Sequence, residues 1–263
     1  MGVNTGSEAI DVENPTGLPA SIEAAWGVRA RPAKGPRPAL SLERIVAAAV
    51  RVAATDGLQA VSMGRVAADL GVSTMSLYRY VGAKDELLAL MADLSFEAPP
   101  AGRGPGESWR DGLARWARSE LEVYRRNPWV LHIPISGPPV TPNALAWLER
   151  GLECLRDTGL EEGEKLSTML LLTGFVRGQA TFQADIAAAQ AAGAAAPDPE
   201  LSAAYGRLLA RLTDPERFPA LHAVIAAGVF GEPDDGDVDF SFGLDRVLDG
   251  IETLIDRRRT GRG

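Results

Sequence analysis

Apolar residues recur at helical spacing through most of this chain of 263 residues. The first clear stripe lies between Ser41, whose side chain suits a helix N-cap, and Gly57, which suits a helix end. Further stripes predict helices at residues 83–96, 107–126, 141–158, 162–190, 199–211, 215–229 and 241–258. No segment shows the alternation of apolar and polar residues that marks a half-buried strand, so the pattern predicts an all-α protein.

Residues 62–84 hold the most informative pattern, two short helices joined by a tight turn at Gly71-Val72. Ser62 and Ser73 each suit the N-cap of one helix, and Leu77 is predicted to be buried. The residues left on the outer face of the second helix are Thr74, Met75, Ser76, Tyr78, Arg79 and Tyr80. This arrangement is typical of a helix-turn-helix, whose second helix enters the DNA major groove. The alternative is an ordinary pair of core helices with a glycine cap.

Residues 42–94 resemble the DNA-binding domain of the TetR (tetracycline-repressor-like) family of bacterial regulators. The most specific part is the string LYRYVGAKDELL at residues 77–88. Weaker similarity continues in SWRDGLARWA at 108–117, YRRNPWV at 124–130 and GPPVTPNALAWLERGLECL at 137–155. The resemblance covers most of residues 40–257. It implies an N-terminal three-helix helix-turn-helix domain that binds a double-stranded DNA operator, and a larger C-terminal helical domain for ligand binding and dimerisation.

The resemblance also implies which residues contact the DNA backbone and which contact the bases. Many relatives carry a basic residue where this chain has Gly64, which leaves Arg65 as the backbone contact from the first helix. Tyr78 and Lys84 are expected to reach phosphates, which fix the position of the protein on the duplex. The residues expected to meet base edges are Thr74, Met75 and Arg79. The full set of predicted DNA-binding residues is Arg37, Ser62, Arg65, Ser73, Thr74, Met75, Ser76, Tyr78, Arg79, Tyr80 and Lys84.

The net charge of −8 is unevenly distributed along the chain. Residues 26–91 carry nine basic groups against five acidic ones, a local excess of +4, whereas the segments before and after are acidic. This asymmetry suits a DNA-binding part joined to an acidic sensor part. Within the basic part, residues 27–38 (GVRARPAKGPRP) read as an extended arm that contacts the DNA backbone or a minor groove. The alternative is a flexible linker whose charges keep it solvated.

Segments rich in proline and glycine, together with changes in composition, predict the domain boundaries. Residues 1–25 are acidic and poor in bulky apolar side chains, so residues 1–38 are predicted to form a disordered tail followed by the basic arm. The helix-turn-helix domain is expected at 39–97, and the effector-binding and dimerisation domain at 107–258. The break between them is APPAGRGPG at residues 98–106.

The composition excludes several classes of protein. No apolar run approaches the ~20 residues of a membrane-spanning helix, and the first thirty residues lack a secretion signal, so we expect a cytoplasmic protein without membrane contact. Cys154 is the only cysteine and cannot form an intramolecular disulfide. The two histidines, His132 and His222, have no partners at metal-ligand spacing, and no catalytic motif is present. We therefore expect no metal, no cofactor and no enzyme activity.

Aromatic residues mark the expected effector site. By resemblance, the helices after residue 107 enclose a ligand cavity, and apolar walls with a few converging polar groups are the usual construction of such sites. The predicted ligand-binding residues are Trp116, Glu120, Trp129, His132, Trp147, Phe175, Gln179 and Phe182. The alternative for each of these aromatic side chains is a place in the plain core, and His132 suits a buried imidazole.

Two apolar stripes predict a dimer seam. They lie in residues 163–189 and 242–257, and paired across a two-fold axis they would form a four-helix bundle. The predicted interface residues are Leu170, Thr173, Leu244, Val247, Leu248, Ile251 and Leu254. The alternative is burial inside one subunit.

The sequence as a whole favours a homodimeric repressor that a small-molecule effector releases from a palindromic operator. The alternatives are an effector-independent regulator or activator, and an interaction module that no longer binds DNA.

Overall fold

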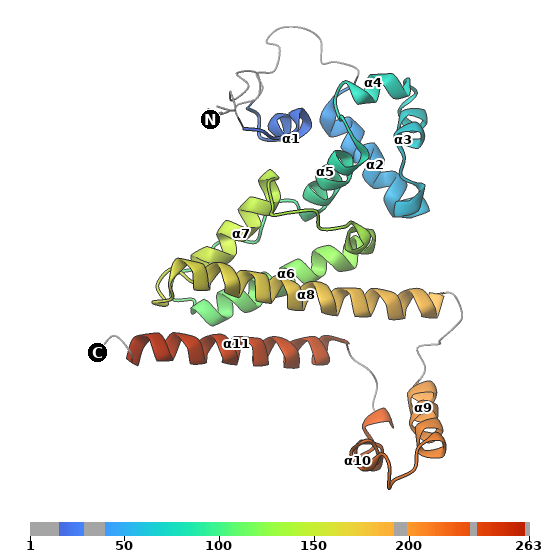
Figure 1. Ribbon diagram of the computed structural model, residues 1–263, viewed down its shortest axis with the longest axis vertical. Coiled ribbons are helices and arrows are strands. Elements are labelled where there is room, and N and C mark those ends of the chain that lie inside the picture. The colour runs from blue at the N-terminus through green and yellow to red at the C-terminus, as the bar shows by residue number, and fades with distance from the viewer. Residues whose placement is uncertain (1–15, 29–39, 192–198, 232–235, 261–263) are drawn as a thin grey trace, which may run out of the picture. The chain divides into compact units, whose positions relative to one another are not determined.

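The computed structural model describes residues 16–28, 40–191, 199–231 and 236–260, and these residues form helices and connecting turns without any strand (Figure 1). The α-helices are α1 (Ala20–Ala25), α2 (Leu42–Asp56), α3 (Met63–Leu70), α4 (Thr74–Tyr78), α5 (Lys84–Phe96), α6 (Trp109–Arg126), α7 (Pro142–Cys154), α8 (Glu162–Ala191), α9 (Pro199–Leu212), α10 (Pro219–Ala226) and α11 (Gly236–Thr260). Short 3-10 turns are η1 (Leu58–Ala60), η2 (Pro128–His132) and η3 (Val229–Gly231). The all-α prediction is confirmed.

The chain divides into two compact units. The first contains the residues up to 107 together with residues 122–154, and the second contains residues 108–121 together with the residues from 155 onward. The boundary therefore falls inside α6 and after α7, and not only at the proline- and glycine-rich break before α6. No described helix is long and apolar enough to cross a membrane.

The first unit is built around α5. α2 packs against α5 and α3, and α3 packs against α4. Fully buried side chains from each element meet in this core, which includes Ile45, Val66, Leu77, Val81 and Leu87. Burial of these five apolar side chains stabilises the domain by roughly 1.5–3 kcal/mol each.

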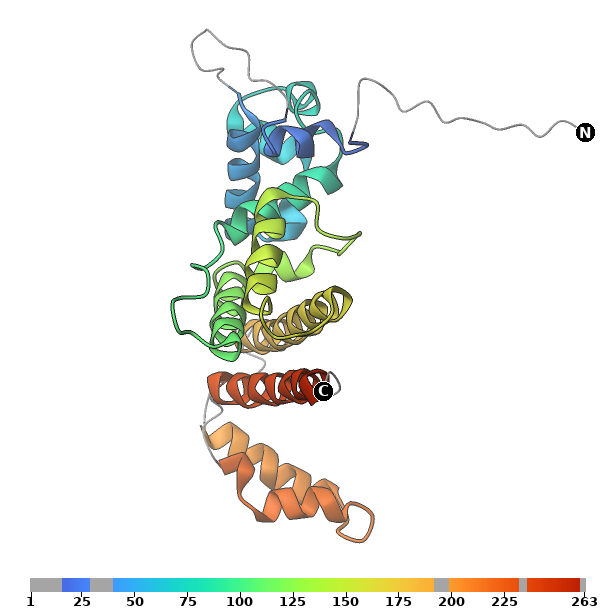
Figure 2. The ribbon, with the colours of Figure 1, turned by 90° about the vertical axis from the view of Figure 1, so that its left-hand side faces the viewer.

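Residues 16–28 differ from the prediction of a disordered acidic tail. They contain α1, which packs against α5 and α2 (Figure 2). Ser21, Ile22 and Glu23 are buried in this contact. The sequence did not indicate the helix because α1 has one turn and a half and a single bulky apolar residue that is buried, so tertiary contacts must supply its stability.

The carboxyl end of α5 is tied to α7 by an unusual cap. Oδ1 of Asp93, buried on α5, accepts hydrogen bonds from the backbone N–H groups of Asn143 (2.9 Å) and Ala144 (3.0 Å) in the first turn of α7. In return, the side-chain amide of Asn143 donates to the Asp93 carbonyl (2.9 Å). Nε1 of Trp147 donates to the carbonyls of Phe96 (3.2 Å) and Glu97 (3.4 Å) at the end of α5. These contacts explain why α7 belongs to the first unit.

The second unit contains α8 and α11, which run antiparallel and side by side (Figures 1 and 2). Arg258 donates to Glu164 (2.6 Å) at one end, and Gln183 donates to the Gly236 carbonyl (3.1 Å) at the other. Between these ends the rings of Phe175 and Phe240 lie 5.4 Å apart. The apolar faces of α8 and α11 thus pack against each other within the same chain.

Arg110 at the start of α6 adds a charged contact to α11. Its guanidinium binds Asp249 (2.6 Å) and Glu252 (3.3 Å). Hydrogen bonds from Arg110 and Arg246 lower the pKa of Asp249 below its ordinary value. The carboxylate is therefore charged throughout the neutral pH range, and any stability that it contributes is lost only as the pH falls through its folded-state pKa.

Candidate nucleic-acid interface and ligand site

The helix-turn-helix is held by local caps that the sequence predicted. Ser62 Oγ accepts from the backbone N–H of Arg65 (3.1 Å) at the start of α3. Gly71 ends that helix in the left-handed region (φ 67°, ψ 31°), where a side chain would be strained. Ser73 Oγ then accepts from the N–H of Ser76 (3.3 Å) at the start of α4. These three residues fix both ends of α3 and the start of α4. The direction of α4 on the surface of the domain is therefore defined.

The exposed face of α4 has the composition of a reading surface. Leu77 anchors the helix in the core, while Met75 is 72% exposed and Tyr78 is 46% exposed. Arg79 is exposed and Thr74 is half-buried. Met75 and Tyr78 beside Arg79 give this surface an apolar, a hydroxyl and a cationic group. A thymine methyl group, a phosphate and a guanine edge are suitable partners for these side chains.

Some predicted DNA-binding residues also have partners within the domain. The Tyr80 hydroxyl donates to the Leu40 carbonyl (3.0 Å) and so holds the residue two positions before α2. The Arg65 guanidinium pairs with Asp56 (3.0 Å) at the end of α2. The hydroxyls of Ser73 and Ser76 lie 2.9 Å apart and bond to each other. Sequence spacing placed these side chains on the surface but could not show which of them the domain itself uses.

Lys84 is exposed and is the first residue of α5. The N-cap residue before it, Ala83, makes no side-chain cap, and Glu86 reaches back to accept from the N–H of Gly82 (3.0 Å). Lys84 is thus displayed at the start of a helix, where the dipole favours an anion. Arg37 and the other basic residues of the arm lie outside the described residues.

The predicted ligand-binding residues fall in both units. In the second unit, Trp116 and Glu120 lie one turn apart on α6 and are buried, whereas Phe175 and Gln179 lie one turn apart on α8 and are half-buried. Phe182 is 63% exposed, so within the described chain it forms no part of an enclosed wall. Of the five candidates in the second unit, the first four thus have the burial expected of cavity residues, and Phe182 does not.

The candidates in the first unit are of three kinds. Trp147 is buried, and its indole nitrogen is already bound to the end of α5. Trp129 is also buried, but its Nε1 makes no hydrogen bond to any described residue. His132, at the end of η2, is exposed, in contrast to the expected core imidazole. Among the described residues no cluster of metal-ligating side chains is found.

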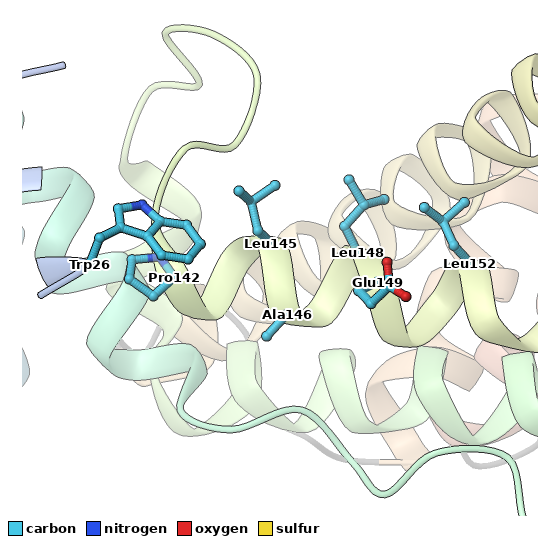
Figure 3. Close-up of a pocket in the computed structure, with 7 residues that line it drawn as sticks. All are labelled: Trp26, Pro142, Leu145, Ala146, Leu148, Glu149 and Leu152. Carbon is cyan, nitrogen blue, oxygen red and sulfur yellow. The ribbon is translucent and has the colours of Figure 1, made fainter. Parts of the chain in front are cut away.

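A groove that the sequence did not indicate lies along α7 (Figure 3). Its volume is about 450 Å³, and Leu145, Leu148 and Leu152 line it together with Trp26. The close-up shows the Trp26 ring beside Pro142 at the start of α7. Trp26 Nε1 donates to the Val140 carbonyl (2.8 Å), which fixes the ring there.

The predicted dimer residues divide into two groups. Leu244, Leu248 and Ile251 are buried within the chain itself, because they pack in the contact that α11 makes inside its own unit. Leu170 is 69% exposed, and Thr173, Val247 and Leu254 are half-buried. A second groove of about 680 Å³ follows α8 and α11. Its lining includes Gly163, Ser167, Leu171, Val247, Gly250 and Leu254.

Comparison with known proteins agrees with both parts of this description. Residues 45–91 match the family model described as bacterial regulatory proteins, tetR family, and residues 101–255 match the tetracyclin repressor-like C-terminal domain. The HTH-type transcriptional repressor DrrR1 of Streptomyces coeruleorubidus is 40% identical over 242 residues, which span 91% of this chain and 87% of DrrR1.

Solved structures show the same fold. The chain is similar to ActR of Streptomyces coelicolor in complex with actinorhodin, with 28% identity and a TM-score of 0.69 over 82% of this chain and 96% of that one. It is also similar to ActR in complex with (S)-DNPA, with 26% identity and a TM-score of 0.68 over 81% and 98% of the two chains. The matched models and DrrR1 all belong to a non-enzymatic family of transcriptional regulators. The caps of the helix-turn-helix and the exposed face of α4 agree with these matches. The chain belongs to the TetR family of helix-turn-helix transcriptional regulators.

Proposed function

We propose that this regulator is a homodimeric repressor that binds a palindromic operator and is released by a small-molecule effector. The observation that carries the DNA half of this proposal is the exposed Met75, Tyr78 and Arg79 face of α4, held in place by the buried Leu77. Two such helices about one helical turn of DNA apart double the sequence that is read. A repressor of this kind acts where bacterial DNA lies, so we infer that it works in the cytoplasm.

Replacing Lys84 by alanine tests the phosphate contact. We expect operator affinity to fall by roughly tenfold for every sequence alike, because a phosphate contact carries no base information. The slope of log affinity against log salt should fall in magnitude by about one unit per subunit contact. A gel shift with the DNA upstream of this chain's own gene, at two salt concentrations, measures both quantities.

Replacing Thr74 by alanine is the matched control. Its side chain is predicted to meet a base edge, so the variant should change the preference at one operator position and leave the salt slope unaltered. The assignment is wrong if Lys84→Ala changes sequence preference instead and keeps the original slope.

The effector half of the proposal is supported by the second unit and by the ActR complexes. Trp116 and Glu120 on α6, with Phe175 and Gln179 on α8, are buried or half-buried in that unit and would supply apolar walls and two polar groups. ActR, which is 28% identical, has been solved with actinorhodin bound. We therefore propose a hydrophobic ligand with hydrogen-bonding groups, and actinorhodin is the first probe.

Gln179→Leu tests this site, because leucine keeps the size of the side chain and removes the amide. We expect the affinity for actinorhodin to fall by about tenfold, the usual result of leaving a ligand polar group without a partner. Operator affinity without ligand should stay within about twofold. Quenching of tryptophan fluorescence measures ligand binding, and release of labelled operator measures the response.

Gln183→Leu, one turn further along α8, is the matched control for that experiment. Gln183 donates to the Gly236 carbonyl, so its loss should lower thermal stability and leave actinorhodin affinity unchanged. If actinorhodin binds tightly and the operator complex persists, the effector-independent regulator replaces the repressor that a ligand releases.

A further inference from the structure

A hydrogen bond joins α1 to the start of α5. Ser21 is buried, and its Oγ donates to Oε2 of Glu86 at 2.6 Å. The same carboxylate oxygen accepts from the N–H of Gly82 at 3.0 Å. Glu86 lies in the first turn of α5, two residues after Lys84. The N-terminal helix α1 therefore contacts an acidic side chain in the turn that contains Lys84.

The charge of Glu86 is unfavourable for DNA binding unless its position is fixed. A carboxylate that rotates towards the DNA phosphate contacted by Lys84 would repel that phosphate. The repulsion is strong at low salt, where screening is weak. Within a helix start, a serine or threonine N-cap would share a reciprocal capping arrangement with Glu86, but Ala83 has no hydroxyl. Ser21 supplies a hydroxyl donor from 65 residues away, and a hydrogen bond to a charged acceptor is stronger than a neutral one.

Several contacts hold α1 in the place that this role requires. Ile22 is buried, and Trp26 donates to the Val140 carbonyl ahead of α7. Thr16 Oγ1 donates to Glu23 Oε1 at 2.7 Å and closes the segment on itself. The position of Ser21 is thus set by both ends of residues 16–28 and does not depend on Glu86 alone.

We propose that Ser21 is a positioning residue for DNA binding, which holds the Glu86 carboxylate against Gly82 and away from the phosphate that Lys84 contacts. The proposal rests on the DNA-binding role proposed for Lys84. It makes α1 part of the DNA-binding machinery through a hydrogen bond, in addition to the predicted contacts of the basic arm.

Ser21→Ala in the full chain tests the proposal. We expect operator affinity to fall about five- to tenfold at about 50 mM salt and by less than about twofold at about 300 mM, since the Debye length shortens about 2.4-fold over that range. Ser21→Thr keeps the hydroxyl and should bind as the unaltered chain does. Gel shifts with the upstream DNA fragment and thermal unfolding are measured on the same samples.

A second substitution separates charge from folding. Glu86→Gln removes the negative charge, so the double variant Ser21→Ala/Glu86→Gln should recover the affinity that Ser21→Ala loses. If the double variant binds as weakly as Ser21→Ala, or if the defect is equal at both salt concentrations, α1 acts only through stability and the proposal is overturned. An unaltered affinity of Ser21→Ala would overturn it as well.

The Lys84→Ala variant distinguishes this failure from a failure of the proposed function. A weakened Lys84→Ala beside an unaltered Ser21→Ala overturns the role of Ser21 alone. If the unaltered chain binds no DNA, or Lys84→Ala binds fully, the phosphate contact and the role of Ser21 are both rejected.

Discussion

Replacing Leu170 by glutamate is expected to convert the protein into a monomer that binds its operator at least about a hundredfold more weakly. Leu170 is 69% exposed on α8, beside the groove that follows α8 and α11. In a two-fold seam the substitution occurs twice, and each buried carboxylate costs about 2 kcal/mol or more. The dimer dissociation constant should then rise by about 10³-fold. Sedimentation at several concentrations measures it, and a gel shift measures the loss of operator binding.

Two other substitutions decide what the Leu170 result means. Ile135→Glu is the matched control, because Ile135 is 74% exposed but lies in the first unit, ahead of α7; this variant should remain a dimer. Leu248→Glu is expected to unfold the subunit itself, since Leu248 is buried within its own chain. A Leu170→Glu protein that sediments as a dimer and binds fully would place the interface elsewhere.

Neutralising the basic arm is expected to give the second large effect. Exchange of Arg29, Arg31, Lys34 and Arg37 for glutamine removes four positive charges and keeps the length of the segment. If all four contact phosphates, the salt slope falls by up to about 3.6 units per subunit, and affinity at about 50 mM salt falls on the order of a hundredfold. Titration of the operator complex at several salt concentrations measures both, and thermal unfolding should be unaltered.

Deletion of the whole segment before residue 39 is a poorer test of the same idea. It would remove Ser21 and Ile22, which are buried where α1 packs against α5 and α2, together with the arm. A loss of affinity could then come either from the lost charges of the arm or from the lost contacts of α1 with α5. An unaltered affinity and slope in the four-glutamine variant would show that the arm is only a linker.

The helix-turn-helix could be predicted in detail because its determinants are local. Ser41, Ser62 and Ser73 each accept from the N–H three residues later, and Gly71 adopts the left-handed conformation. Each of these features depends on a window of a few residues, which spacing alone reveals. The second helix proved shorter than expected, since α4 ends at Tyr78, yet Leu77 is fully buried as predicted, and Val81 beyond the helix end is fully buried as well.

Roles that depend on distant partners could not be predicted. The stripe on α11 correctly indicated a buried face, but a stripe does not say whether the covering surface belongs to the same chain, as it does at Leu248. Tyr80 and Trp147 carry polar atoms that suited DNA or ligand, and both are bound to backbone carbonyls 40 or more residues away. α1 was missed for the same reason, since its stability comes from α5 and α2.

The cap that Asp93 provides for α7 has a consequence for how such regulators can be recombined. A chimera cut at the proline- and glycine-rich break would separate Asp93 from Asn143 and Trp147 from Phe96, and would leave the first turn of α7 without its acceptors. The reading head that can be transplanted is therefore discontinuous, with residues 16–107 and 122–154 inherited together. We expect new effector specificity in this lineage to arise by substitutions in place, in residues 108–121 and after 155, rather than by exchange of whole domains.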